Sequence, residues 1–122
     1  TPWQIPVFIY GFVADMPDFM RAADILITKA GPGTIAEGFI CGLPIILYSK
    51  MPGQEDGNVT HVVHEGAGVW APEPRQVAAT LQRWLAHPEV RARVAANSRR
   101  LANPDASRQI ARLLGSVLSL GA

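Results

Sequence analysis

The sequence has little cysteine and little net charge. Cys41 is the only cysteine in 122 residues, so a disulfide within the chain is excluded, and its apolar helical setting predicts a small core residue. A single thiol is compatible with a reducing compartment. Lysine and arginine number 11 against 10 aspartates and glutamates, which leaves a formal net charge of +1. This balance gives no sign of a polyanion-binding surface, so we expect no nucleic-acid partner.

Long apolar segments are also missing. The longest charge-free apolar stretch, residues 38–49, is too short to cross a bilayer and is interrupted by Gly42 and Pro44. The opening Thr-Pro-Trp-Gln has neither the basic segment nor the apolar core of a secretory signal. The lack of an initiator Met and the abrupt entry into a predicted strand lead us to expect a fragment of a longer enzyme.

Common nucleotide and metal motifs are absent as well. The sequence has no Walker loop, no Gly-x-Gly-x-x-Gly pattern and no Asp-x-Asp pair for a divalent cation. His61 and His64 lie three residues apart on one predicted helix face and could form a metal pair, but the spacing offers no third ligand. A helix surface explains them better, so we expect no metal and no cofactor.

Apolar runs alternate with helical patterns in the first part of the chain. Strands are expected at residues 7–10, 24–28, 44–48 and 69–71, and helices at 17–23, 35–41, 58–65, 75–86, 88–101 and 104–118. This order predicts an α/β fold with a Rossmann-like parallel sheet, followed by C-terminal helices. We expect one partial domain over residues 1–122, with its sheet portion at about 1–71 and its helical portion at 74–120.

The most informative segment is Lys29-Ala30-Gly31-Pro32-Gly33-Thr34-Ile35-Ala36-Glu37, which follows the second predicted strand. A glycine-rich turn between a strand and a helix lets backbone N–H groups approach a phosphate, and the helix N-terminus adds partial positive charge. Thr34 offers a hydroxyl, Lys29 a positive charge, and Glu37 a carboxylate for ribose hydroxyls. The segment predicts a nucleotide-diphosphate site, although a purely structural turn fits the local pattern equally well.

Three loops are expected to converge at the carboxyl ends of the strands, where parallel sheets bind ligands. They span residues 11–15, 29–34 and 49–58. The third loop carries Gln54 and Glu55, which can fork onto neighbouring hydroxyls as sugar recognition requires, and Asn58 is the expected cap of the next helix. A solvated loop tip is the plain alternative, but loops at this location favour function. The convergence therefore favours a nucleotide-sugar site.

Several segments together form a recognisable pattern. They are Gly11-Phe12-Val13, Ile27-Thr28 with the run Lys29 to Glu37, Gly42-Leu43-Pro44-Ile45-Ile46-Leu47, Pro52-Gly53-Gln54-Glu55-x-Gly57-Asn58, Val62-Val63 and Gly66-Ala67-Gly68-Val69. They closely resemble the monogalactosyldiacylglycerol synthase family and, more loosely, the peptidoglycan enzyme that adds N-acetylglucosamine to lipid I. Both are inverting glycosyltransferases of the GT-B fold. The resemblance implies that this chain is the later part of a C-terminal, donor-binding domain.

The resemblance also implies a role for each matching position. These positions are Phe12 and Val13 at the uracil edge, Gly33 and Thr34 at the diphosphate, Glu37 at the ribose, and Gln54, Glu55 and Asn58 at the sugar. With Lys29 and Gly31 of the same turn, they form the expected nucleotide-sugar site. The galactolipid family also has Gln-Glu at the sugar, whereas the peptidoglycan enzyme has Gln-Gln, which favours UDP-galactose or UDP-glucose as the donor.

The implied activity is hexose transfer from a UDP-hexose to a lipid acceptor such as diacylglycerol. The general base and acceptor pocket would belong to an N-terminal domain that this chain lacks, so we expect no catalytic residue here and no transfer by this segment alone. The full protein is expected at the cytoplasmic side of a membrane as a peripheral enzyme. The alternatives are a cell-wall type N-acetylglucosaminyltransferase, a non-catalytic donor-binding subunit of a split transferase, and an epimerase of the same fold.

Overall fold

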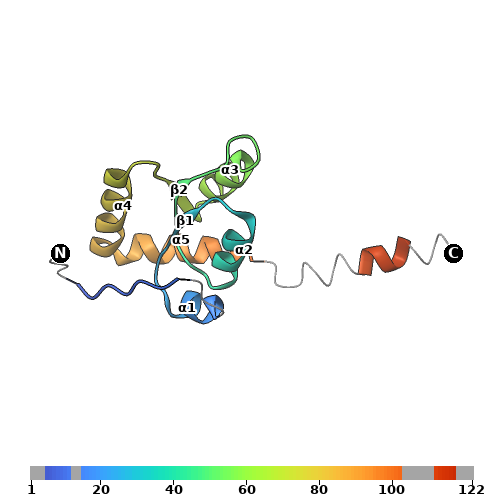
Figure 1. Ribbon diagram of the computed structural model, residues 1–122, viewed down its shortest axis with the longest axis horizontal. Helices are drawn as coiled ribbons and strands as arrows, with labels where there is room; N and C mark the ends of the chain where they lie inside the picture. The colour runs from blue at the N-terminus through green and yellow to red at the C-terminus, as the bar shows by residue number, and fades with distance from the viewer. Residues whose placement is uncertain (1–4, 12–14, 103–111, 118–122) are drawn as a thin grey trace.

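A computed structural model describes residues 5–11, 15–102 and 112–117. The described residues form a three-stranded parallel sheet in the order β1-β2-β3, preceded by helix α1 and followed by helices α4 and α5 and by the helical residues 112–117 (Figure 1). The elements are α1 (Met16–Ala22), β1 (Leu26–Lys29), α2 (Pro32–Ile40), β2 (Ile45–Ser49), α3 (Asp56–His64), β3 (Gly68–Trp70), α4 (Pro74–Ala86) and α5 (Pro88–Arg100). The predicted α/β, Rossmann-like architecture is confirmed.

Two clusters of buried side chains cover the two faces of the sheet. On one face, Ile45 and Leu47 of β2 pack against side chains from α2 and α3. On the other face, Ile46 packs against Trp84 of α4, whose side chain is among the largest that are fully buried. Successive residues of β2 thus point into different helix layers, because side chains alternate along a strand. An apolar central strand is what a parallel sheet with both faces covered requires.

Helix α2 lies close to the sheet because Gly38 has no side chain. A Cβ at this position would lie 2.9 Å from Leu26 Cδ2 and 3.2 Å from Ile45 Cδ1. The close approach keeps the N-terminus of α2 next to the carboxyl end of β1, where the chain enters the helix. The packing of α2 therefore positions the turn that the sequence singles out.

The prediction of a strand at residues 7–10 is wrong. These residues have no regular secondary structure, and the side chains of Phe8 and Ile9 are 75% and 89% exposed. A strand needs a hydrogen-bonding neighbour, and in the described part of the chain β1 pairs with β2 alone. β-rich composition without a paired edge leaves the segment extended but unpaired. The other three strands lie within two residues of their predicted positions.

Two helices begin two or more residues earlier than predicted. α2 begins at Pro32, and proline suits the first turn of a helix because its missing N–H would have no acceptor there. α3 begins at Asp56 with Glu55 at the N-cap, so the prediction that Asn58 caps this helix is wrong. The shift places Gly33 and Thr34 inside the first turn of α2 rather than in a loop before it.

The C-terminal helices follow the predicted apolar pattern in part. Trp84 is buried as expected, but Leu85, predicted on the same face of α4, is 62% exposed. Of the last predicted helix, residues 112–117 are helical, and residues 104–111 and 118 lie outside the described part of the chain. In the described ranges, no helix has the length and apolar character needed to cross a membrane.

Candidate nucleotide-sugar site

The candidate site lies at the carboxyl ends of β1 and β2. Lys29 and Ser49 are partners in the strand register, and the N–H of Ala30 donates a hydrogen bond to the Ser49 carbonyl at 2.9 Å. The turn into α2 and the loop into α3 begin from these two neighbouring positions. The structure therefore brings together the second and third loops that the sequence predicts to converge.

The first turn of α2 presents free backbone donors. The N–H of Ile35 donates to the Gly31 carbonyl at 3.1 Å, and Pro32 has no N–H. The N–H groups of Gly33 and Thr34 have no acceptor within the helix because they belong to its first turn. Both residues are exposed. An anion at this point would meet two donors and the positive end of the helix dipole.

Gly31 and Gly33 are not required by the conformation or packing of the chain. Gly31 has a φ of −71°, and neither residue is among the glycines with positive φ. A Cβ on Gly33 would meet no atom within 4 Å, and one on Gly31 only Glu55 Oε2 at 3.9 Å. Glycine in a helix costs up to about 1 kcal/mol relative to alanine. Glycine at an open position of a helix is typical of a place where another molecule approaches the backbone.

Thr34 and Glu37 line a cavity on one side of the turn. The cavity has a volume of about 450 Å³ and is lined by Met16, Met20, Leu26, Ile27, Thr28, Gly33, Thr34 and Glu37. Glu37 lies one helical turn beyond Gly33 and is exposed. Its carboxylate can accept hydrogen bonds from hydroxyls of a ligand whose anionic group lies at the helix N-terminus.

A second cavity lies between the turn and the neighbouring loop. It has a volume of about 200 Å³ and is lined by Lys29, Ser49, Lys50, Met51 and Glu55. Lys29 and Glu55 were predicted as site residues from different loops, and this cavity brings them together. A cationic and an anionic side chain around one small cavity can bind a phosphate and sugar hydroxyls, respectively.

The side chain of Glu55 is folded back onto its own loop. Its Oε1 accepts a hydrogen bond from the N–H of Met51 at 2.7 Å, while the N–H of Glu55 donates to the Met51 carbonyl at 2.9 Å. Its Oε2 lies beside Gly31, as the 3.9 Å separation from a Cβ there indicates. Glu55 thus faces the turn with one carboxylate oxygen already bonded, whereas Gln54 is exposed.

Asn58 links the loop to the turn. Its Nδ2 donates a hydrogen bond to the Ala30 carbonyl at 2.9 Å, between residues 28 positions apart in the chain. The partner is backbone, so this amide group fixes the start of α3 against the start of α2. Neither periodicity nor spacing could identify this partner. Contact of Asn58 with a sugar stays a prediction, and Phe12 and Val13, predicted at the uracil edge, lie outside the described residues.

Lys50 and Asp56 are residues that the sequence analysis missed. Lys50 Nζ lies 2.8 Å from Asp56 Oδ1, and Asp56 Oδ2 accepts a hydrogen bond from the N–H of Gly53 at 3.1 Å. The hydrogen bond from Lys50, followed by that from Gly53, lowers the pKa of the Asp56 carboxyl below its usual value. The only signal in the sequence was two opposite charges flanking Pro52-Gly53, a common turn pair.

The lowered pKa of Asp56 predicts a pH-dependent contribution to stability. Because the carboxyl holds its proton less tightly in the folded chain, its contribution is fully present above its unfolded pKa of about 3.9 and is lost as the pH falls through the lowered value. We expect wild type to unfold at higher denaturant concentration than Asp56→Asn above about pH 5. The two midpoints should converge as the pH falls below about 3.9 in urea titrations followed by fluorescence. A constant difference over this range would contradict the assignment.

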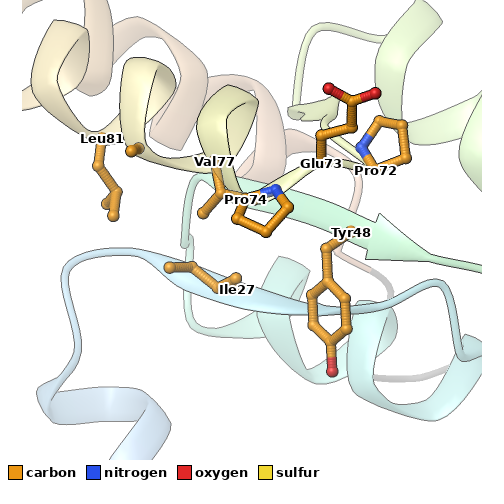
Figure 2. A pocket seen from close by; sticks show the side chains of 8 residues that line it. Ile27, Tyr48, Pro72, Glu73, Pro74, Val77 and Leu81 are labelled. Atoms are coloured by element: carbon orange, nitrogen blue, oxygen red, sulfur yellow. The ribbon is translucent and has the colours of Figure 1, made fainter.

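A separate apolar groove lies on the α4 face of the sheet. It has a volume of about 370 Å³ and is lined by Ile27, Tyr48, Pro72, Glu73, Pro74, Val77, Ala78 and Leu81. Ile27 and Tyr48 on the sheet lie opposite Val77 and Leu81 on α4, while the Glu73 carboxylate points away (Figure 2). This groove contains no cationic side chain, so its lining does not suit a diphosphate.

In the part of the chain that the structure describes, no third metal-ligating side chain lies beside His61 and His64 of α3. The ring of His61 makes an edge contact with Phe39, with ring centroids 6.1 Å apart. Among the residues that the structure describes, no three His, Cys, Asp or Glu side chains gather in a way that could hold a metal ion. The Phe39 contact is consistent with a helix-surface role for His61.

Comparison with known proteins gives a consistent picture. Residues 3–110 match the glycosyltransferase family 28 C-terminal domain. The chain is 50% identical over 105 residues to the probable monogalactosyldiacylglycerol synthase 2, chloroplastic, of Oryza sativa subsp. indica, covering 85% of this chain and 22% of that protein. It is 48% identical over 105 residues to monogalactosyldiacylglycerol synthase 3, chloroplastic, of Arabidopsis thaliana, covering 85% and 23%.

A solved structure has a similar fold. The crystal structure of MurG from Acinetobacter baumannii superposes with a TM-score of 0.74 at 21% sequence identity, covering 88% of this chain and 33% of that one. At this identity the likeness concerns the fold, which is that of a GT-B C-terminal domain. The chain spans about a fifth of the length of the curated relatives that it matches.

Proposed function

Because the chain belongs to the glycosyltransferase family 28 C-terminal domain family, we propose that it binds the UDP-hexose donor of an inverting glycosyltransferase. The observation that carries the proposal is a spatial order at the edge of the sheet: the glycine-rich turn lies between two cavities. The cavity with Glu37 lies on one side of the free N–H groups of α2, and the cavity with Lys29 and Glu55 lies toward the next loop. A nucleoside diphosphate sugar has the same order, with its anionic group between two hydroxyl-rich ends.

The proposed pose assigns one part of the donor to each element. The diphosphate lies at the N–H groups of Gly33 and Thr34, with Lys29 adding positive charge. The ribose hydroxyls donate to Glu37, and the hexose lies toward Gln54 and Glu55. Phe12 and Val13 are proposed at the uracil edge, and Asn58 at the base of the sugar loop.

The geometry also suits the chemistry of the leaving group. When the glycosidic bond to phosphate breaks, negative charge develops on the departing UDP. The N–H groups at the start of α2 are oriented toward that charge before the reaction, and such preorganised donors typically contribute several kcal/mol. We propose that donor binding by this domain uses no metal and no cofactor. The general base that deprotonates the acceptor is proposed in another part of the protein.

The acceptor is proposed from the relatives. The relatives described above are named monogalactosyldiacylglycerol synthases, and the Gln54-Glu55 pair favours a galactose or glucose donor. We therefore propose hexose transfer to a lipid such as diacylglycerol, at an acceptor site outside this chain. A lipid acceptor implies peripheral membrane contact of the whole protein, proposed at the cytoplasmic side.

Calorimetric titration of the complete polypeptide that carries this chain tests the proposal. We expect UDP and UDP-galactose to bind, and Glu37→Ala to weaken both, because two ribose hydroxyls lose a charged acceptor. A loss of about 2 kcal/mol corresponds to roughly 30-fold in Kd. Glu89→Ala, which removes an exposed glutamate at the start of α5, is the matched control and should leave Kd unchanged.

Each other outcome has a distinct meaning. Unchanged UDP binding by folded Glu37→Ala would refute the assignment of the ribose site. Preference for UDP-N-acetylglucosamine over UDP-galactose would favour the cell-wall type of transferase. Release of UDP without any acceptor would indicate an epimerase or hydrolase in place of a transferase.

A further inference from the structure

The loop between β2 and α3 is fastened at three points by the protein's own side chains. The Glu55 carboxylate accepts a hydrogen bond from the N–H of Met51, and the Asp56 carboxylate accepts one from the N–H of Gly53. Gly53 has a φ of +82°, which glycine adopts without strain, so the tight turn in this loop is intrinsic to the sequence. The third point is Lys50, and it alone among the three connects the loop to another strand.

Lys50 contacts two elements besides its own. Its Nζ lies 2.8 Å from Asp56 Oδ1 at the start of α3 and 5.3 Å from the centroid of the Trp70 ring at the end of β3. Both distances are within the ranges for an ion pair and for a cation–π contact. The Lys50 side chain is only 33% exposed. The ammonium group therefore joins the end of β2, the start of α3 and the end of β3.

The two lysines at this edge of the sheet are in different situations. In the described part of the chain Lys29 forms no salt bridge, so its charge remains available to a phosphate. The charge of Lys50 is already neutralised by Asp56 and its ammonium lies over an aromatic ring. Lys29 is thus suited to contact the ligand, and Lys50 is suited to hold the protein in place.

From these contacts we infer that Lys50 is the positioning residue of the sugar-binding loop. By fixing Asp56 against Trp70, it sets where Gln54 and Glu55 lie relative to the phosphate-binding turn. The inference rests on the proposed function, because it concerns the hexose part of the proposed donor. Lys50 also lines the cavity proposed for the hexose, but its ammonium group is held by Asp56 and lies over the Trp70 ring, so its role in this arrangement is to position the loop.

The test compares UDP with UDP-galactose and UDP-glucose in the complete polypeptide. We expect Lys50→Met, which keeps the apolar stem and removes the charge, to leave the Kd of UDP within twofold. The additional affinity that the hexose gives over UDP should fall about fivefold to tenfold, and the donor KM should rise by a similar factor. Lys50→Arg, which can form both contacts, should restore most of the loss. If Lys50 only stabilised the fold, Lys50→Met would not lower the additional affinity given by the hexose while leaving the Kd of UDP unchanged.

A second variant and a second lysine complete the design. Asp56→Asn removes the partner of Lys50 at nearly constant volume. It should also leave UDP binding unchanged and lower the additional affinity given by the hexose, which keeps the test valid if Lys50→Met does not fold. Lys29→Met should weaken UDP and UDP-hexose equally. Equal weakening of both ligands by Lys50→Met would make Lys50 a phosphate ligand and overturn the inference, as would unchanged binding of both. Failure of wild type to bind UDP at all would instead refute the proposed function.

Discussion

Gly33→Ala is expected to abolish most donor binding while stabilising the fold. Gly33 lies in the first turn of α2, and a Cβ there meets no protein atom within 4 Å, so the helix gains from alanine. The gain is up to about 1 kcal/mol. The proposed phosphate approaches this same backbone, and the added methyl would displace it from the N–H groups. Losing charge-assisted hydrogen bonds of about 1.5–3 kcal/mol each lowers affinity by about 100-fold or more.

The opposite signs of the two effects make this prediction specific. Calorimetry with UDP gives the affinity, and the urea midpoint of the same protein gives the stability. Gly115→Ala is a matched control, because Gly115 lies in the helical residues 112–117 and also has open space at its Cβ position. It should leave UDP binding unchanged. Binding retained by Gly33→Ala within a factor of three would mean that no anion lies against this turn.

Gly68→Ala is expected to destabilise the domain severely. Gly68 is the first residue of β3 and pairs with Ile45 of β2, and a Cβ there would overlap the Ile45 carbonyl oxygen and lie 2.9 Å from Val62 Cγ1. The carbonyl belongs to the central strand and cannot move without breaking the sheet. Overpacking of this kind costs about 3 kcal/mol or more. The expected fall in the thermal midpoint is about 10 °C or more for a domain of this size.

Thermal and urea unfolding of the variant measure this effect. Gly57→Ala in the first turn of α3 is the stability control, since a Cβ there has no neighbour within 4 Å. The control should be neutral or slightly stabilising because alanine favours a helix. A Gly68→Ala protein as stable as wild type would mean that β3 does not lie against β2 in the register described.

The elements that sequence predicted well are those whose signal is local. The buried run at β2 and the glycine-rich turn before α2 depend on residues next to one another, and both are in place. The segment at residues 7–10 has equally strong β-forming residues, but strand formation depends on a neighbouring edge that composition does not reveal. Leu85 fits the helical period of α4, yet its side chain is exposed, because the period alone does not show which part of an apolar face meets the sheet.

The contacts that organise the candidate site could not be predicted. The partner of Asn58 is the backbone of Ala30, and the partners of Lys50 lie on α3 and β3. Such contacts depend on how elements pack, and their residue types are common on any polar loop. Sequence therefore identified the glycines, Glu37, the Gln54-Glu55 pair and Asn58 as candidates, while only the structure gave the contacts that hold them together.

The hydrogen bond between Asn58 and the Ala30 carbonyl has a kinetic consequence. It joins the start of α3 to the start of α2, so the two halves of the site are connected by the protein's own groups. A site that is already ordered loses little conformational freedom when a ligand arrives. The rate of encounter is then set by diffusion and orientation, and related ligands differ mainly in their dissociation rates. For the donor binding proposed above, we therefore expect discrimination between donor sugars by residence time rather than by speed of capture.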